Sequence, residues 1–317
     1  MNDANGLSPV AGSAAPRRTP APAASTEVVD SLGVDALVFA GGGCRCFWQI
    51  GFLTAAKTRL ALEPAYVVGV SAGSAMATIL LADRVQLARE CFREATAANE
   101  KNFYPERLWR SSEPAVPHLG MYGGVLREAF DAEALRSLAA GPPMDVLLAR
   151  PPSWMPALPA LFLGFGAYML ERRARDEVHP SWPKRVGYRP ELVRVQDVIA
   201  DHESDPRGAA EALVELILAS SCTPPVTPYF RYGGRPVLDG GLVDNVPDFA
   251  VPESSQHALV MLTRHYPAEK LPVDPRKTIV QPSRPIPVNK WDYTSPELLE
   301  ETYALGLEDG ERFALGV

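Results

Sequence analysis

Ser71 stands where a catalytic nucleophile would be expected. Residues 69–73 around it read GVSAG and match the pattern Gly-x-Ser-x-Gly. An apolar run that favours a strand precedes the motif, and small residues that favour a helix follow it. On such a strand-to-helix turn the serine hydroxyl is exposed, while Gly69 and Gly73 let the two elements approach without a clash. The pattern therefore predicts that Ser71 is a nucleophile on a tight elbow.

A run of glycines earlier in the chain predicts backbone donors. Gly41, Gly42 and Gly43 directly follow another apolar run. Glycine is costly to order, so such a run at a strand end indicates N–H groups presented to a ligand or a developing charge, although an ordinary tight turn has the same composition. The stretch fails as a dinucleotide-binding fingerprint, because Cys46 stands where the third glycine belongs.

A serine hydroxyl needs a base, and Asp239 is the first candidate. It ends a short apolar run and is followed by two glycines, which let another group come close. Asp244 lies nearby, but Asn245 and Pro247 mark its surroundings as a loop. We therefore expect Asp239 to take the serine proton directly.

Histidine is the alternative base. The chain has five histidines: His118, His179, His202, His257 and His265. Ser71, Asp239 and then His257 or His265 would reproduce the chain order of the triad in α/β-hydrolases. That fold places several strands before its nucleophile, whereas only one strand and one helix are predicted ahead of Ser71. The triad is therefore the weaker mechanism.

The elements that must position these residues alternate between strand and helix. Apolar runs predict strands over residues 36–40, 65–70, 144–150 and 257–263. Helical composition is found over residues 47–62, 71–84, 209–221 and 295–313. This alternation favours a mostly parallel sheet with helices on its faces, whose loops at the carboxyl ends of the strands carry the chemistry.

Composition argues against several other classes of protein. The formal net charge of −7 argues against sequence-independent nucleic-acid binding, which needs clustered Lys and Arg. The four cysteines have neither the spacing of a zinc site nor the density of a disulfide scaffold, so we expect no metal, no cofactor and a reducing compartment, the cytoplasm. Residues 1–32 are rich in Ala and Pro, which predicts a disordered tail and no signal peptide.

Residues 153–170 form an apolar stretch that is followed at once by the basic sequence ERRAR. Pro156, Pro159, Gly164 and Gly166 interrupt the stretch, which argues against a membrane-spanning helix. We expect a buried or cap helix here. Peripheral contact with a lipid interface is the alternative, because basic residues flank the apolar ones.

The motifs GGGCRC, GVSAG and DGG, the last followed by LVDNVP, occur in this order. Together they resemble the patatin-like phospholipases, acyl hydrolases with a Ser-Asp dyad in a three-layer α/β/α fold, and the resemblance covers residues 35–252. It implies that Ser71 is the nucleophile and Asp239 the base of the dyad. It also implies that the backbone of Gly41, Gly42 and Gly43 forms the oxyanion hole, with Arg45 supporting that loop. The substrate would be a phospholipid or another acyl-ester lipid.

The sequence departs from the family pattern at Cys46, which replaces the last glycine of the oxyanion motif. If that position required a positive φ, the cysteine would strain the loop. The scaffold would then suit a non-catalytic lipid-binding or regulatory protein, which is a second alternative to the dyad hydrolase beside the Ser-His-Asp esterase.

We therefore expect an α/β/α sandwich with a mostly parallel central sheet. The predicted organisation is a disordered tail over residues 1–32, a catalytic domain over 33–255 with an apolar insertion or cap around 151–204, and a C-terminal strand and helix over 256–317 that pack back on the domain. The expected function is that of a phospholipase A or lysophospholipase type of esterase acting through an acyl-enzyme.

Overall fold

The structure is a computed structural model that describes residues 33–60, 62–107, 115–152, 166, 178–179, 187–224 and 226–316. The tail predicted over residues 1–32 lies outside the described residues. So does the apolar stretch 153–170, except for Gly166, and so does most of the insertion expected around it. The part of the chain that is described contains both predicted turns and both residues of the predicted dyad.

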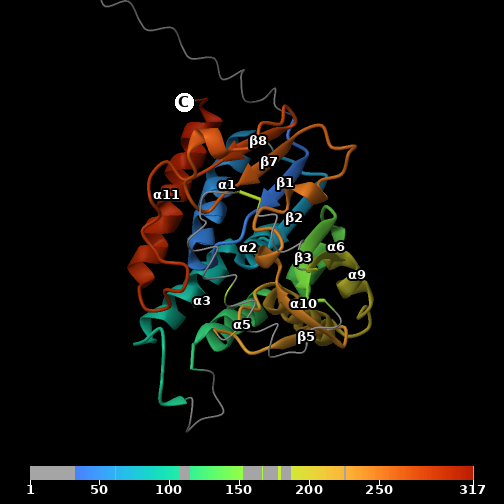
Figure 1. Ribbon diagram of the computed structural model, residues 1–317, viewed down its shortest axis with the longest axis vertical. Helices are drawn as coiled ribbons and strands as arrows, with labels where there is room; N and C mark the ends of the chain where they lie inside the picture. The colour runs from blue at the N-terminus through green and yellow to red at the C-terminus, as the bar shows by residue number, and fades with distance from the viewer. Residues whose placement is uncertain are drawn as a thin grey trace, which may run out of the picture.

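An eight-stranded, mostly parallel β-sheet forms the centre of the protein (Figure 1). Its strands are β1 (Ala36–Phe39), β2 (Tyr66–Val70), β3 (Met144–Arg150), β4 (Arg189–Arg194), β5 (Phe230–Tyr232), β6 (Arg235–Asp239), β7 (Ala258–Met261) and β8 (Lys277–Val280). The order is β5-β6-β3-β2-β1-β7-β8, and β4 also pairs with β3. The pairs from β3 through β2, β1 and β7 to β8 are parallel, whereas β4 and β6 pair antiparallel with β3. Strands β1, β2, β3 and β7 are buried along their whole length, as expected of parallel strands covered on both faces.

Helices flank this sheet, which confirms the predicted α/β class. They are α1 (Phe47–Leu60), α2 (Ala72–Leu81), α3 (Val85–Ala97), α5 (His118–Ala129), α6 (Ala132–Ala140), α9 (Val195–Ala200), α10 (Pro206–Ser220) and α11 (Pro296–Ala314). Short 3-10 helices occupy η2 (Gly43–Cys46), η3 (Gly240–Leu242), η4 (Asp248–Ala250) and η5 (Ala268–Lys270). Among the described residues, no helix combines the length and the apolar character needed to cross a bilayer.

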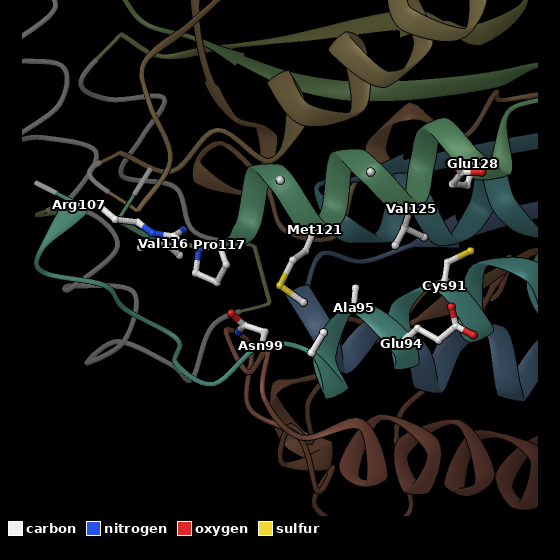
Figure 2. Close-up of a pocket in the computed structure, with 13 residues that line it drawn as sticks. Cys91, Glu94, Ala95, Asn99, Arg107, Val116, Pro117, Met121, Val125 and Glu128 are labelled. Atoms are coloured by element: carbon white, nitrogen blue, oxygen red, sulfur yellow. The ribbon is translucent and has the colours of Figure 1, made fainter. Parts of the chain in front are cut away.

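A groove of about 910 Å³ opens between α3 and α5 (Figure 2). Met121 and Val125 of α5 face Cys91 and Ala95 of α3 across it. Gly120 and Gly124 also line the groove, and a methyl group added at either would meet no atom within 4 Å. The groove is thus open partly because these two helical positions carry no side chain.

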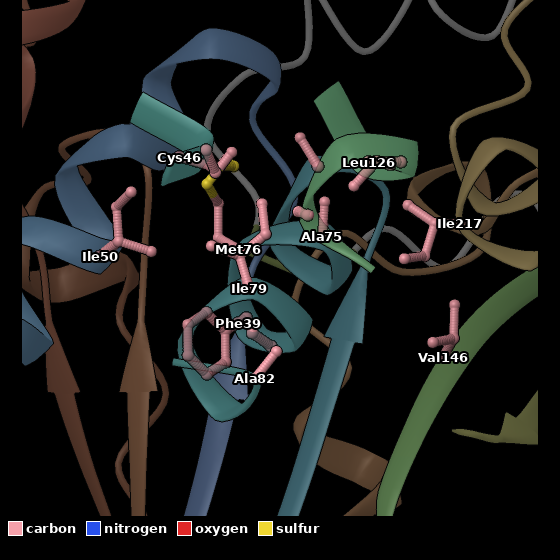
Figure 3. Close-up of a cluster of buried hydrophobic side chains, with 14 of the residues drawn as sticks. Phe39, Cys46, Ile50, Ala75, Met76, Ile79, Ala82, Leu126, Val146 and Ile217 are labelled. Atoms are coloured by element: carbon pink, nitrogen blue, oxygen red, sulfur yellow. The ribbon is translucent and has the colours of Figure 1, made fainter. Parts of the chain in front are cut away.

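The main core lies between the sheet and the helices on one face. Phe39 and Val146 of the sheet lie beneath Ile50 of α1, Leu126 of α5 and Ile217 of α10, and the α2 residues Ala75, Met76 and Ile79 fill the centre (Figure 3). A second, smaller core lies on the other face, where Val38, Val68 and Val260 pack with Val246 and Tyr266. Both cores bury alternate residues of the same strands, so the strand ends are held rigidly between them.

Helix α11 packs along α1, and glycines on both helices let the two backbones come into close contact (Figure 1). A Cβ added to Gly306 would lie 2.2 Å from the carbonyl oxygen of Trp48, and one added to Gly51 would lie 2.2 Å from that of Tyr303. The indole Nε1 of Trp48 also donates a hydrogen bond of 2.8 Å to Asp309. Because α1 begins directly after the glycine turn, the packing of α11 against α1 also helps to fix the position of that turn.

We expect Gly306→Ala to destabilise the fold by about 1–3 kcal/mol, because its methyl group must push the backbones of α1 and α11 apart. Gly124→Ala is the matched control, because its methyl group enters open space. The higher helix propensity of alanine should stabilise this variant by up to about 1 kcal/mol. Urea unfolding of both variants measures the difference. Equal stability of the two variants would mean that the α1–α11 contact does not depend on glycine.

Candidate active site

Ser71 occupies the turn between β2 and α2. Its backbone has a φ of 53° and a ψ of −135°, a conformation that few residues other than glycine adopt. Its N–H donates to the Ser220 hydroxyl at 2.8 Å, and its carbonyl oxygen accepts from the Ser74 hydroxyl at 2.6 Å. A Cβ on Gly73 would lie 2.5 Å from the Ala40 carbonyl oxygen, so this glycine lets α2 approach β1. The elbow is therefore strained and held from several sides.

The ends of β2 and β6 meet on one edge of β3. Leu147 pairs with Val70 of β2, and the next residue, Leu148, pairs with Asp239 of β6. Both leucines also pair with β4, which occupies the opposite edge of β3. Because a strand has only two edges, β2 and β6 share one of them and point their carboxyl ends at each other. This pairing sets the elbow residue Ser71 beside Asp239.

Gly240 makes this meeting sterically feasible. A Cβ at that position would lie 2.2 Å from the carbonyl oxygen of Leu147. The backbone at Gly240 therefore lies directly against the backbone of β3, with no room for a side chain between the two. The first glycine after the predicted base thus serves a close approach of two backbones.

Asp239 accepts a hydrogen bond directly from Ser71. The serine Oγ lies 2.9 Å from Oδ2 of the carboxylate. Two further donors hold the carboxylate: the Gly241 N–H reaches Oδ1 at 2.8 Å, and the Thr223 hydroxyl reaches Oδ2 at 3.1 Å. Ser71 is 5% exposed and Asp239 is 7% exposed, so the pair is largely shielded from solvent.

The glycine turn places its N–H groups unequally. Gly41, one of the three predicted oxyanion donors, donates its N–H to the Asn245 carbonyl oxygen at 3.0 Å, so this N–H is already engaged in the present geometry. No backbone hydrogen bond among the described residues engages the N–H of Gly42 or Gly43. Arg45 donates from Nε to the Gly42 carbonyl oxygen at 3.3 Å and so braces the turn. The candidate donors are therefore Gly42 and Gly43.

Gly43 is the residue of this turn that requires glycine for its backbone. Its φ is 59°, and a Cβ there would lie 2.1 Å from the Lys290 carbonyl oxygen. Cys46 does not have a positive φ; it lies inside η2 with its thiol buried, 3.6 Å from the Ala40 carbonyl oxygen. The anticipated strain at Cys46 is therefore absent, because the left-handed position is Gly43. Burial raises the pKa of the neighbouring Cys44 thiol to about 12, so it is uncharged.

Two side chains that the sequence analysis did not single out anchor the turn. The Asn245 amide Nδ2 and the Thr263 hydroxyl both donate to the Gly41 carbonyl oxygen, at 3.0 and 2.6 Å. Asn245 thus engages both the N–H and the carbonyl of Gly41. The sequence showed Asn245 only as part of a loop, because its partner Gly41 lies 204 residues earlier in the chain.

Three of the other candidates for the base, Asp244, His257 and His118, contact groups other than Ser71. Asp244 accepts from the Val246 N–H at 3.1 Å and contacts Nδ1 of His179 at 3.1 Å, a contact that raises the pKa of His179. His257 is hydrogen-bonded to Thr278 at 2.7 Å. His118 contacts the Tyr293 hydroxyl at 2.5 Å, and burial lowers its pKa to about 3. The direct contact between Ser71 and Asp239 leaves no space between them for an imidazole.

Ser71 and Asp239 thus form a buried, hydrogen-bonded serine–carboxylate pair on an α/β fold. Among known families, the model of the patatin-like phospholipases matches residues 37–248, more than half of the chain. The chain belongs to the patatin-like phospholipase family, whose members are lipid acyl hydrolases. A search of curated proteins gave no match to the chain. The described residues hold no group of three or more His, Cys, Asp or Glu side chains suited to a metal ion.

Asn245→Ala should slow the reaction of Ser71 with a fluorophosphonate probe about tenfold to a hundredfold. The substitution removes the Nδ2 donor from the Gly41 carbonyl and loosens the turn that would hold the developing oxyanion. Labelling rates followed by mass spectrometry measure the effect, and thermal unfolding checks that the fold persists. Unchanged labelling in Asn245→Ala would show that the turn does not depend on this anchor.

Proposed function

We propose that the protein hydrolyses acyl-ester lipids of the phospholipase A or lysophospholipase kind, with Ser71 as nucleophile and Asp239 as base. The hydrogen bond of 2.9 Å between Ser71 Oγ and Asp239 Oδ2 is the observation that carries the proposal. The strained elbow and the nearby N–H groups of Gly42 and Gly43 support it, since an acyl transfer needs a nucleophile, a base and an oxyanion site together.

Acylation begins when Ser71 Oγ attacks the ester carbonyl carbon. The serine proton passes to Oδ2 of Asp239, and the carbonyl oxygen gains charge as the tetrahedral intermediate forms. The N–H groups of Gly42 and Gly43 would stabilise that charge, and losing one such donor typically costs about 100-fold to 1000-fold in rate. The intermediate collapses, the bond to the leaving alcohol breaks, and that alcohol takes the proton from Asp239. The acyl group remains on Ser71.

Deacylation repeats the sequence with water as the nucleophile. Water attacks the acyl carbon and gives a proton to Oδ2 of Asp239. The bond between the acyl carbon and Ser71 Oγ then breaks, and the proton moves from Oδ2 to Oγ. The fatty acid leaves and the serine is restored. The cycle consumes one water and needs no other reactant.

The alternative of a non-catalytic lipid-binding protein rested on Cys46. A cysteine at that position would have suggested a distorted oxyanion loop, yet its thiol is accommodated in the core beside Met76 (Figure 3). No observation on the described residues favours loss of catalysis. The substrate class in this proposal is accordingly an acyl-ester lipid that the protein cleaves.

Asp239→Asn should lower the release of fatty acid from phosphatidylcholine and lysophosphatidylcholine micelles about a thousandfold or more. Asparagine keeps the shape of the side chain and can still accept from Gly241, so the thermal unfolding midpoint should change little. Ser71→Ala should abolish both hydrolysis and fluorophosphonate labelling. Asp244→Asn is the matched control and should retain activity, because Asp244 contacts His179 rather than Ser71.

Two results would contradict the proposal. Full activity of Asp239→Asn together with loss of activity in a His257 or His265 variant would favour the triad. Absence of fluorophosphonate labelling in the unsubstituted protein, in the presence of lipid, would favour the binding protein.

A further inference from the structure

Two hydroxyl groups share one oxygen of the Asp239 carboxylate. Ser71 and Thr223 donate to Oδ2 at 2.9 and 3.1 Å, whereas the Gly241 N–H donates to Oδ1. The mechanism above gives roles to Ser71 and to the carboxylate but none to Thr223. A hydrogen bond to a charged acceptor is stronger than one between neutral groups, so the position of this hydroxyl has consequences for the base.

Thr223 is held firmly in the turn that follows α10. Its N–H donates to the Thr227 hydroxyl at 2.8 Å, and the carbonyl oxygen of the preceding Cys222 accepts from the Asp239 N–H at 2.6 Å. The Thr223 hydroxyl lies 3.1 Å from Asp239 Oδ2 and 3.4 Å from the Ser221 carbonyl oxygen. The carboxylate is therefore both the nearer and the charged acceptor.

The two donors on Oδ2 behave differently during the reaction. Once Ser71 is acylated, its Oγ is an ester oxygen without a proton, so the hydrogen bond from Ser71 to Asp239 is lost. The Gly241 N–H still holds Oδ1, but the torsion about Cβ–Cγ that turns the carboxylate is soft. A donor on Oδ1 together with a donor on Oδ2 therefore fixes the plane of the carboxylate more tightly than the Gly241 N–H does by itself. Thr223 keeps its proton throughout and can donate to Oδ2 in both halves of the cycle.

We propose that Thr223 is a positioning residue for deacylation, holding Oδ2 of Asp239 where it accepts the proton of the attacking water. The proposal rests on the proposed Ser71–Asp239 mechanism. In this step the water O–H bond breaks and its proton goes to Oδ2, while a bond forms between the water oxygen and the acyl carbon. The proton then passes from Oδ2 to Ser71 Oγ as the acyl–Oγ bond breaks. Thr223 gains and loses no atom.

The test separates acylation from deacylation with 4-nitrophenyl butyrate, a soluble ester. Release of nitrophenolate in the first turnover reports acylation, and kcat reports the full cycle. Thr223→Val should lower kcat about tenfold to a hundredfold while the first-turnover rate and kcat/KM change less than threefold, so that a burst of about one equivalent appears. Thr223→Ser retains the hydroxyl and should restore at least half of kcat.

The pH profile gives a second readout. Loss of a donor to the carboxylate makes its ionised form less favoured, so the acid limb of kcat in Thr223→Val should move to higher pH by about one unit. Thr302→Val is the matched control: it removes a buried hydroxyl that donates to the Leu298 carbonyl oxygen in α11, away from the dyad. This control should show neither the burst nor the pH shift.

The proposal is overturned if acylation and kcat fall equally in Thr223→Val, or if Thr302→Val reproduces its effects. If Thr223→Val does not fold, as judged by thermal unfolding, Thr223→Ala is measured in its place and the same outcomes apply. Failure of the underlying mechanism looks different. In that case the unsubstituted protein and Ser71→Ala would hydrolyse the ester equally, and no variant would show a burst.

Discussion

One edge of β3 is shared by two strands that meet end to end, and the candidate site depends on this meeting. Leu147 and Leu148 are neighbours in the chain, yet their partners on that edge come from β2 and β6, which are far apart in the sequence. The edge offers a single row of hydrogen-bonding groups, so β2 must leave the ladder where β6 enters it. The elbow at Ser71 and the carboxylate of Asp239 are adjacent because one strand has to stop for the other.

The glycine turn at residues 41–43 is held in place mainly by parts of the chain that follow Asp239. The side chains of Asn245 and Thr263 donate hydrogen bonds to the Gly41 carbonyl oxygen, and the Lys290 carbonyl packs on Gly43. Helix α11 packs against α1, the helix that follows the turn. The glycine motif therefore supplies a flexible backbone, and its geometry comes from elsewhere. This division explains why the same three glycines have unequal roles: the first is tied into the structure through its N–H, while the other two keep theirs available.

Local patterns predicted the class of fold and pointed to Ser71 and Asp239 as the candidate dyad, because each prediction depends on a short motif or on strand–helix alternation. Interactions between distant segments were beyond such reasoning. Nothing in the sequence indicates that the Gly41 N–H donates a hydrogen bond to Asn245, or that the Thr223 hydroxyl donates one to Asp239. Strand β4 escaped prediction for another reason: it lies on the edge of β3, is largely exposed and contains Pro190, so it lacks the continuous apolar run of a central strand.

The φ of 53° at Ser71 also has a thermodynamic consequence. Glycine would adopt this backbone without steric strain, whereas a serine held there forgoes on the order of 1–3 kcal/mol of folding free energy through strain. The residue that best fits the backbone at position 71 is thus not the one that can attack a carbonyl. Ser71→Gly should therefore unfold at a higher denaturant concentration, but it would lack the hydroxyl group that could attack a substrate. Stability and reactivity thus make opposing demands on the side chain at position 71.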